Sequence, residues 1–277
     1  AIGQEAIAIG PNASAVGNHS VSVGEQAKSG ANYSVAIGSN ANASEQYAVA
    51  ISGAASGRGA IALRGSAEGN LSFAAGAAAV ATKEGAIALG TDAHAFGNQS
   101  ISIGWLSEAT GEIATALGHS AKASAKYSFA QGWKSNASAE NATAIGTLAN
   151  ASGLSSIAFG KNASAVRGNA ISIGNTSNAY DSAIALGENA NATSAYGISI
   201  GANSKTTAIN AIALGLLSNA TGIHSIATGW RSNSSGFSAV AVGVESNAIG
   251  NYSIAISGGA NASGHQSIAM GLLSNAS

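Results

Sequence analysis

The chain has 277 residues, of which only 8% are charged, with a net charge of -1 and no cysteine. This composition excludes a basic surface for nucleic acid and a polybasic patch for membranes. It also excludes a disulfide framework and any cysteine-based metal or redox centre, so we expect no cofactor and no metal.

A short pattern that ends in glycine repeats along the whole sequence. In its clearest form it runs from Ser34 to Gly38 as small, branched, small, branched, glycine, and most copies follow one another at the same interval. Self-similarity at a fixed short period, here about 14 residues, is typical of a solenoid in which each repeat forms one turn. The closing glycines are Gly10, Gly24, Gly38, Gly76, Gly90, Gly104, Gly118, Gly132, Gly146, Gly160, Gly174, Gly187, Gly201, Gly215, Gly229, Gly243 and Gly271.

Each repeat contains two stretches with the alternation of a β-strand. The first places branched residues such as Val35 and Ile37 at every second position, and the second is built on alanine, as at 40–44. A strand, a turn, a second strand and a second turn within one such short period predict a flattened parallel β-roll with two sheets. We expect the branched side chains to face the interior, so that a charge at Ile173 would unravel the turn.

Regularity is lost in one segment as the chain is followed from the N-terminus. Between 52 and 76 the glycine shifts by one position, the steps 52–64 and 64–76 are shorter than the others, and Arg58, Arg64 and Glu68 cluster. The surface should therefore differ most in this segment. Beyond it the period returns, with one slightly shortened step at 174–187, and we predict a single repetitive domain over 1–277.

Four branched positions carry polar residues, and inside a core these would need hydrogen-bond partners. We expect them to bond backbone or ordered water near a turn; the alternative is an ion or ligand site on an oligomer axis. The four residues are Thr115, Gln131, Thr143 and Thr228.

A roll this thin buries little apolar surface per turn, which predicts association with other copies through a flat face of small residues. The residues just after the glycine are the best candidates for contacts with a partner. Residues at the same position of successive repeats lie in one column along a solenoid. Trp105, Trp133 and Trp230 share this phase, and Arg231 follows the last. They either seal turns, pack between subunits, or form a stripe that binds a partner.

Two further copies carry a family resemblance. N-A-I-S-I-G-N-T-S at 169–177 and N-A-I-A-L-G-L-L-S at 210–218 resemble the N-S-V-A-I-G-x-x-S head repeat of YadA-like trimeric autotransporter adhesins. The resemblance covers residues 6–277, although Tyr33, Gln99 and Tyr127 replace the leading asparagine in other copies. It implies a left-handed parallel β-roll, a homotrimer, and a stalk above an outer-membrane anchor. The residues that match the motif, and to which ligand binding is carried over, are Asn169, Ser177, Asn210 and Ser218.

The resemblance implies a bacterial adhesin head that binds host extracellular matrix proteins such as collagen or fibronectin, or the host cell surface. We therefore expect a protein on the outer membrane of a Gram-negative bacterium, with membrane contact only through a C-terminal anchor that this sequence does not contain. A structural spacer, with the binding site elsewhere, is the alternative, and an ice-binding solenoid is a weaker one.

Enzymatic classes fit poorly. Only two aspartates occur, which disfavours paired-carboxylate catalysis and calcium-binding repeats. Hexapeptide acyltransferase rolls have a much shorter period than this chain. We predict that the protein is not an enzyme.

Overall fold

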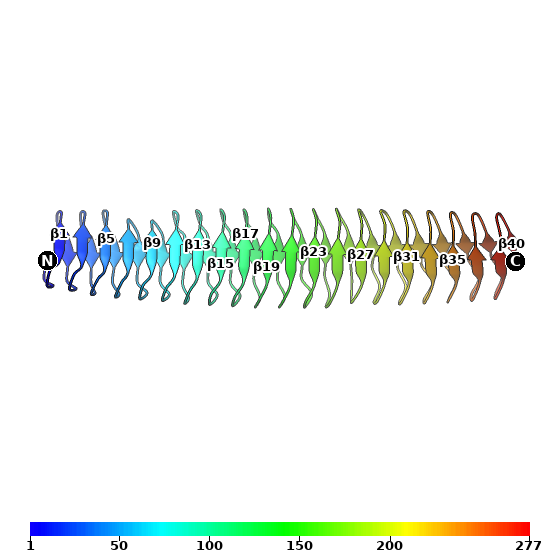
Figure 1. The fold of residues 1–277 in the computed structure, drawn as a ribbon, viewed down its shortest axis with the longest axis horizontal. Helices are drawn as coiled ribbons and strands as arrows, with labels where there is room; N and C mark the ends of the chain where they lie inside the picture. Colours follow the sequence, from blue (N-terminus) through cyan, green and yellow to red (C-terminus); the bar gives the residue numbers. More distant parts are fainter. The chain divides into compact units, whose positions relative to one another are not determined.

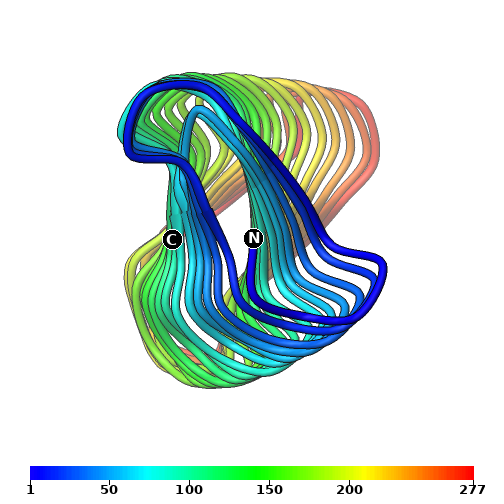
Figure 2. The ribbon, with the colours of Figure 1, turned by 90° about the vertical axis from the view of Figure 1, so that its left-hand side faces the viewer.

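The computed structural model describes residues 1–277 as 40 short β-strands without a helix. The chain forms two compact units, 1–138 and 139–277, which are described separately. In both units each repeat is one turn: a three-residue strand, a turn, a two-residue strand and a second turn (Figure 1). Figure 2 shows the first turns of unit 1, in blue, lying behind one another. The predicted all-β parallel solenoid, with one repeat in each turn, is confirmed.

In unit 1 the odd-numbered strands form one parallel sheet and the even-numbered strands another; Val21, for example, pairs with Val35 of the next repeat. The odd-numbered strands are β1 (Ile7–Ile9), β3 (Val21–Val23), β5 (Val35–Ile37), β7 (Val49–Ile51), β9 (Ile61–Leu63), β11 (Phe73–Ala75), β13 (Ile87–Leu89), β15 (Ile101–Ile103), β17 (Thr115–Leu117) and β19 (Phe129–Gln131). The even-numbered strands are β2 (Ser14–Ala15), β4 (Lys28–Ser29), β6 (Asn42–Ala43), β8 (Ala54–Ala55), β10 (Ser66–Ala67), β12 (Val80–Ala81), β14 (His94–Ala95), β16 (Glu108–Ala109), β18 (Lys122–Ala123) and β20 (Asn136–Ala137).

Unit 2 repeats this plan, and the predicted shortened step after Gly174 appears where Ile171 pairs with Ile184. Its odd-numbered strands are β21 (Thr143–Ile145), β23 (Ile157–Phe159), β25 (Ile171–Ile173), β27 (Ile184–Leu186), β29 (Ile198–Ile200), β31 (Ile212–Leu214), β33 (Ile226–Thr228), β35 (Val240–Val242), β37 (Ile254–Ile256) and β39 (Ile268–Met270). Its even-numbered strands are β22 (Asn150–Ala151), β24 (Ser164–Ala165), β26 (Asn178–Ala179), β28 (Asn191–Ala192), β30 (Lys205–Thr206), β32 (Asn219–Ala220), β34 (Asn233–Ser234), β36 (Asn247–Ala248), β38 (Asn261–Ala262) and β40 (Asn275–Ala276).

The interior of both units consists almost entirely of alanine and serine. The middle residue of each odd-numbered strand points inward, as at Ala36 and Ser172, which are fully buried. The largest fully buried side chain in the chain is Thr206. The prediction that the branched residues face the interior is therefore wrong: they point outward, and Ile173 is 38% exposed.

The reason is the length of the turn. Alternation gives a strand two faces but does not say which one lies inside. Two sheets joined by such short connections lie too close together for facing isoleucines, so methyl and hydroxymethyl groups fill the space between them at close packing.

The four polar residues at branched positions point outward for the same reason. Gln131 is exposed, and the three threonines are only half-buried. They need no partner inside the roll, and the alternative of an ion or ligand site on an oligomer axis stays a prediction, because these side chains lie on the outward side of the strands. The residues concerned are Thr115, Gln131, Thr143 and Thr228.

Most serines inside the roll bond their hydroxyl groups to one another or to backbone carbonyls, whereas Ser156, Ser225 and Ser253 have no partner for theirs. The Oγ atoms of Ser102 and Ser107 lie 2.7 Å apart, and Ser199 and Ser204 repeat this pair in unit 2. Buried hydroxyl groups that are hydrogen-bonded avoid the cost of desolvation without a partner. Serine can therefore replace alanine in the core where a second serine or a backbone carbonyl of the same turn accepts its hydroxyl group, as the carbonyl of Ala27 does for Ser22.

A glycine follows all odd-numbered strands except β7, β9 and β37, and two reasons for it are visible at Gly104. Its φ is +132°, and a Cβ there would lie 2.6 Å from the carbonyl oxygen of Gly118 in the next turn. Backbone in this region strongly favours glycine, although Ser257 adopts a φ of +105° at the equivalent position after β37.

We expect Gly104→Ala to lower the free energy of unfolding by about 1–3 kcal/mol from backbone strain alone, with the clash adding to it. Denaturant melts of the variant measure this loss. Gly168→Ala is the matched control, because a Cβ at Gly168 has no neighbour nearer than 3.9 Å. Equal melts for the two variants would contradict the stated role of the turn glycine.

The two short repeats predicted between 52 and 76 are present. Ile51 pairs with Leu63, and Leu63 with Ala75, which are the two shortened steps. These repeats are shorter because the turn after the three-residue strand has fewer residues. Only Ser52 and Gly53 separate β7 from β8, whereas the turn from β5 to β6 spans 38–41. Figure 1 shows this as two lower loops above β7 and β9.

Candidate binding surfaces

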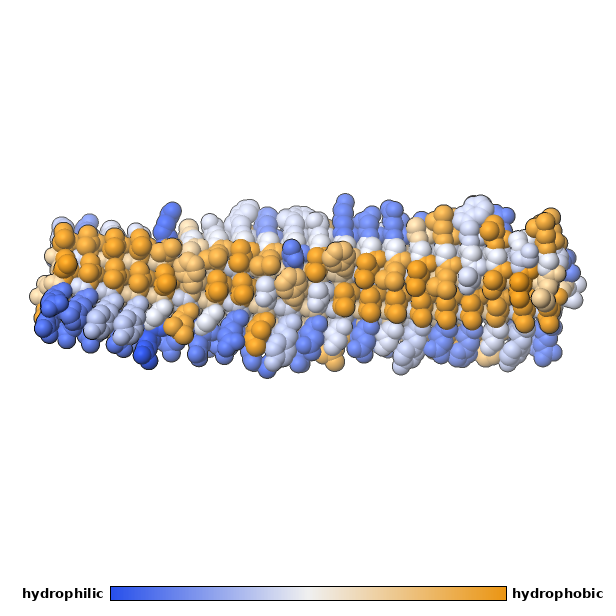
Figure 3. Space-filling view, in the orientation of Figure 1, coloured by the Kyte–Doolittle hydropathy of each residue, from blue (hydrophilic) through white to orange (hydrophobic).

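The outward side of the odd-numbered strands is apolar in both units. The first and third residues of these strands, such as Val35 and Ile37, form two rows that we call the strand face (Figure 3). Most of these side chains are half-buried or exposed. A contiguous exposed apolar surface of this kind marks an interaction site on soluble proteins.

A second candidate surface lies along the turns that follow the glycines, which we call the glycine-turn edge. In unit 1, Trp105 is 54% exposed and Trp133 is 42% exposed, and His119 lies between them. The rings of Trp105 and His119 stack with centroids 4.6 Å apart, while His119 meets Trp133 edge-on at 6.5 Å. The Nζ of Lys134 lies 4.6 Å from the centroid of Trp133. Three successive turns thus present one exposed aromatic cluster with a cation beside it.

In unit 2 the same edge carries Trp230, which is 41% exposed. The guanidinium of Arg231 lies 5.0 Å from the Trp230 ring, and its Nη1 lies 3.5 Å from the Glu245 Oε1. Exposed Leu216 and Val244 flank the tryptophan in the adjacent turns. All three tryptophans are therefore accessible in the single chain, so they do not seal turns by burial.

The motif residues fall into two groups. Asn169 and Asn210 are exposed at turn positions with φ of +56°, and Asn210 Nδ2 lies 3.4 Å from His224 Nδ1. Ser177 and Ser218 are fully buried and donate to the carbonyl oxygens of Gly174 and Gly215 at 3.0 and 2.9 Å. These two serines hold the turn, and the expectation that they contact a ligand is wrong because no hydroxyl reaches the surface.

Side-chain amides on the outer side of the even-numbered strands in unit 2 form a ladder that the sequence analysis missed. Nδ2 of each asparagine donates to Oδ1 of the next, over distances of 2.7–3.2 Å. The sequence contains a sign of this ladder, because asparagine stands at the same position of successive repeats in this part of the chain. The residues of the ladder are Asn219, Asn233, Asn247, Asn261 and Asn275.

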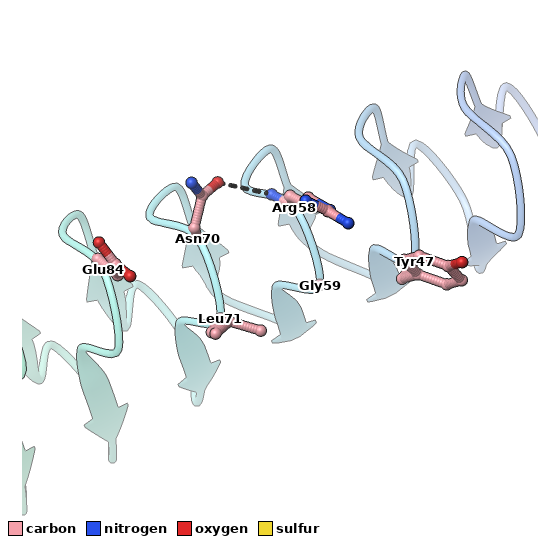
Figure 4. Close-up of a pocket in the computed structure, with 6 residues that line it drawn as sticks. All are labelled: Tyr47, Arg58, Gly59, Asn70, Leu71 and Glu84. Carbon is pink, nitrogen blue, oxygen red and sulfur yellow. Dashed lines mark hydrogen bonds between the residues drawn. The ribbon is translucent and has the colours of Figure 1, made fainter.

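The segment with short repeats carries a hollow of about 520 Å³ (Figure 4). The backbone N–H of Arg58 donates to Asn70 Oδ1 at 3.0 Å on its rim. The hollow is lined by Tyr47, Arg58, Gly59, Asn70, Leu71 and Glu84.

The structure contains no group of three or more His, Cys, Asp or Glu side chains that could hold a metal ion. It also contains no helix of the length and apolarity needed to cross a membrane.

Comparison with known proteins gives one clear family match. The family model described as "YadA head domain repeat" matches successive stretches in both units, and the longest stretch left unmatched is 52–66, within the short repeats. The matches cover residues 1–27, 29–51, 67–93, 81–107, 109–135, 125–149, 137–163, 151–177, 181–204, 207–232, 234–256 and 258–277.

Among solved structures, the chain is similar to the crystal structure of the collagen-binding domain of the Yersinia adhesin YadA. The two are 20% identical over 80% of this chain and 79% of that one, with a TM-score of 0.18. At that score the likeness adds nothing to the family assignment, which rests on the repeat matches. A search of the curated proteins found no match.

Proposed function

Because the chain belongs to the YadA head domain family, we propose that it is the head of an adhesin that binds host extracellular matrix or the host cell surface. The family consists of non-enzymatic adhesin domains of the bacterial cell surface, so the chain is an adhesin-type domain of a surface protein. The host ligand, and a C-terminal anchor in the outer membrane of a Gram-negative bacterium, are parts of the proposal.

The observation that carries the proposal is that matches to the family repeat fill most of both units. Each turn presents side chains at the same positions, so a contact made by one turn is available again in its neighbours. Many weak equivalent sites convert modest contacts into avidity when the ligand is itself repetitive, as a fibrous matrix protein is.

We also propose that the chain forms a homotrimer, and the apolar strand face supports this. An interior of alanine and serine buries few methyl groups per turn, whereas isoleucine, leucine and valine remain on the outside. Burial of each such side chain contributes about 1.5–3 kcal/mol, so covering the strand face with two further copies would add stability that the single roll lacks.

Ligand contact is assigned to the remaining exposed candidates. Exposed tryptophan and arginine are favoured as interface anchors, and the turn asparagines offer amide groups on the other edge, before the odd-numbered strands. The proposed contact residues are Trp105, Trp133, Trp230, Arg231, Asn169 and Asn210.

Binding of the purified protein to immobilised collagen, fibronectin and cultured host cells tests the proposal. We expect binding to at least one of them, and we expect it to fall steeply when repeats are deleted, because avidity depends on their number. A folded protein that binds none of these surfaces would contradict the proposal and would favour the structural spacer.

A further inference from the structure

A ladder of stacked rings runs along one edge of the first turns of unit 1. The rings of His19 and Tyr33 have centroids 5.1 Å apart and planes 8° apart, and those of Tyr33 and Tyr47 are 5.3 Å and 12° apart. Glu5 begins the ladder, with its Oε2 3.1 Å from His19 Nδ1. All four residues occupy the same left-handed turn position before an odd-numbered strand, with φ between +54° and +63°.

The ladder ends because the next residue at this position is a glycine. Gly59 has the same backbone conformation, with φ of +64°, but no side chain to stack on Tyr47. The residue after it in the column is Leu71, whose Cδ2 would lie 3.0 Å from a Cβ at Gly59. Tyr47 is 50% exposed, and only one side of its ring is covered by Tyr33.

The space left by the missing side chain is the hollow described above. Its volume of about 520 Å³ lies within the range of about 300–1,000 Å³ found for small-molecule sites. Figure 4 shows Tyr47 and Leu71 on either side of Gly59, with Arg58, Asn70 and Glu84 along the neighbouring turns. The hollow therefore combines a ring face and an aliphatic side with a polar rim.

The rim offers both donors and acceptors. Arg58 supplies guanidinium N–H groups and Glu84 supplies carboxylate oxygens, so the two formal charges cancel. Asn70 Oδ1 accepts the backbone N–H of Arg58, which leaves the Nδ2 donor for another partner (Figure 4). A ligand that matches this rim has no net charge and carries several groups that donate and accept hydrogen bonds, as the hydroxyl groups of a sugar do.

We propose that this hollow binds one neutral hexopyranose ring of a glycan. The C–H face of the sugar lies on Tyr47, in the place where the ladder would have its next ring, and its hydroxyl groups bond to Arg58, Asn70 and Glu84. An aromatic side chain of a protein would stack equally well on Tyr47, but it would not use the donors and acceptors of the rim, whereas sugar hydroxyl groups can bond to them. The inference does not depend on binding to matrix proteins.

Gly59→Tyr is the decisive variant, because it fills the hollow with the ladder's own continuation. Tyrosine already adopts this left-handed conformation at the same turn position elsewhere, for example at Tyr127 and Tyr252. A Cβ at Gly59 meets only the flexible end of Leu71 within 4 Å. The variant should therefore fold, which circular dichroism checks.

The probes are methyl β-D-galactopyranoside, methyl β-D-glucopyranoside and methyl α-D-mannopyranoside, titrated against the whole chain and followed by NMR. We expect at least one of them to bind with a dissociation constant of about 1–10 mM, as is usual for a single small ring. Gly59→Tyr and Tyr47→Ala should each weaken binding at least about tenfold, since each removes the stacking contact. Tyr47→Phe keeps the ring and should keep binding, and Tyr252→Ala, at the same turn position in unit 2, should leave it unchanged.

Three outcomes would overturn the proposal. The first is that none of the glycosides binds, and the second is that Gly59→Tyr binds as well as the parent protein. The third is that N-acetylphenylalaninamide binds in the hollow while the glycosides do not, which would assign it to an aromatic side chain of a protein. Adhesion to matrix proteins is measured separately, so either proposal can fail while the other stands.

Discussion

Replacing Ala185 by Asp is expected to unravel unit 2 around β27. Ala185 is fully buried in the middle of that strand and pairs with Ser172 on one side and Ser199 on the other. A carboxylate there has no cation to pair with and loses its hydration, which costs several kcal/mol. Denaturant melts followed by circular dichroism should show loss of stability of that size.

Ile173→Asp is the matched comparison, because Ile173 lies on the adjacent strand but points outward, with 38% of its surface exposed. We expect this variant to keep its β-sheet signal and to weaken association through the strand face. If Ile173→Asp unfolds the chain while Ala185→Asp does not, the orientation of the strands described above is wrong.

Changing Trp105, Trp133 and Trp230 together to Ser is expected to reduce binding to the matrix ligand by at least about tenfold, since interface tryptophans contribute about 2 kcal/mol or more each. The melting temperature should change little, because all three side chains are substantially exposed and lose only ring stacking and cation–π contacts. Surface plasmon resonance and thermal melts on the same preparation measure both quantities.

The comparison for this variant is Tyr127→Ser with Tyr196→Ser and Tyr252→Ser, which removes exposed rings from the other edge, where Asn169 and Asn210 lie, and so measures the share of that edge in binding. A fall in stability of about 3–5 kcal/mol in the tryptophan variant would indicate buried rings in the assembled protein. That result, or dissociation of the oligomer, would make the tryptophans subunit contacts rather than ligand contacts.

The sequence was sufficient to predict the period, the two sheets, the turn glycines and the short repeats. It was not sufficient to predict which face of each strand is buried, because the alternation of residues is the same in either case. A clue was present in the residues themselves: the middle position is always alanine or serine, whereas its neighbours vary from Phe73 to Gln131. A position that tolerates only the smallest side chains indicates a tightly packed interior.

The candidate contacts were predicted in part for related reasons. Equal phase placed the tryptophans on one edge in each unit, and their exposure agrees with a surface role. The prediction that Ser177 and Ser218 contact a ligand was wrong. A polar residue in a repeated motif can belong to the interior, as both of these serines do. The hollow at Gly59 was not predicted, since it arises from a missing side chain beside Tyr47 and not from a motif.

The oligomeric state tests the central claim most directly, because the head is proposed to work as a trimer that covers its strand face. The mass of the purified chain by multi-angle light scattering at micromolar concentration decides the question. The account predicts three times the chain mass of 26.6 kDa. A stable, folded species of 26.6 kDa would contradict it, because the apolar strand face would then be exposed to water without a partner.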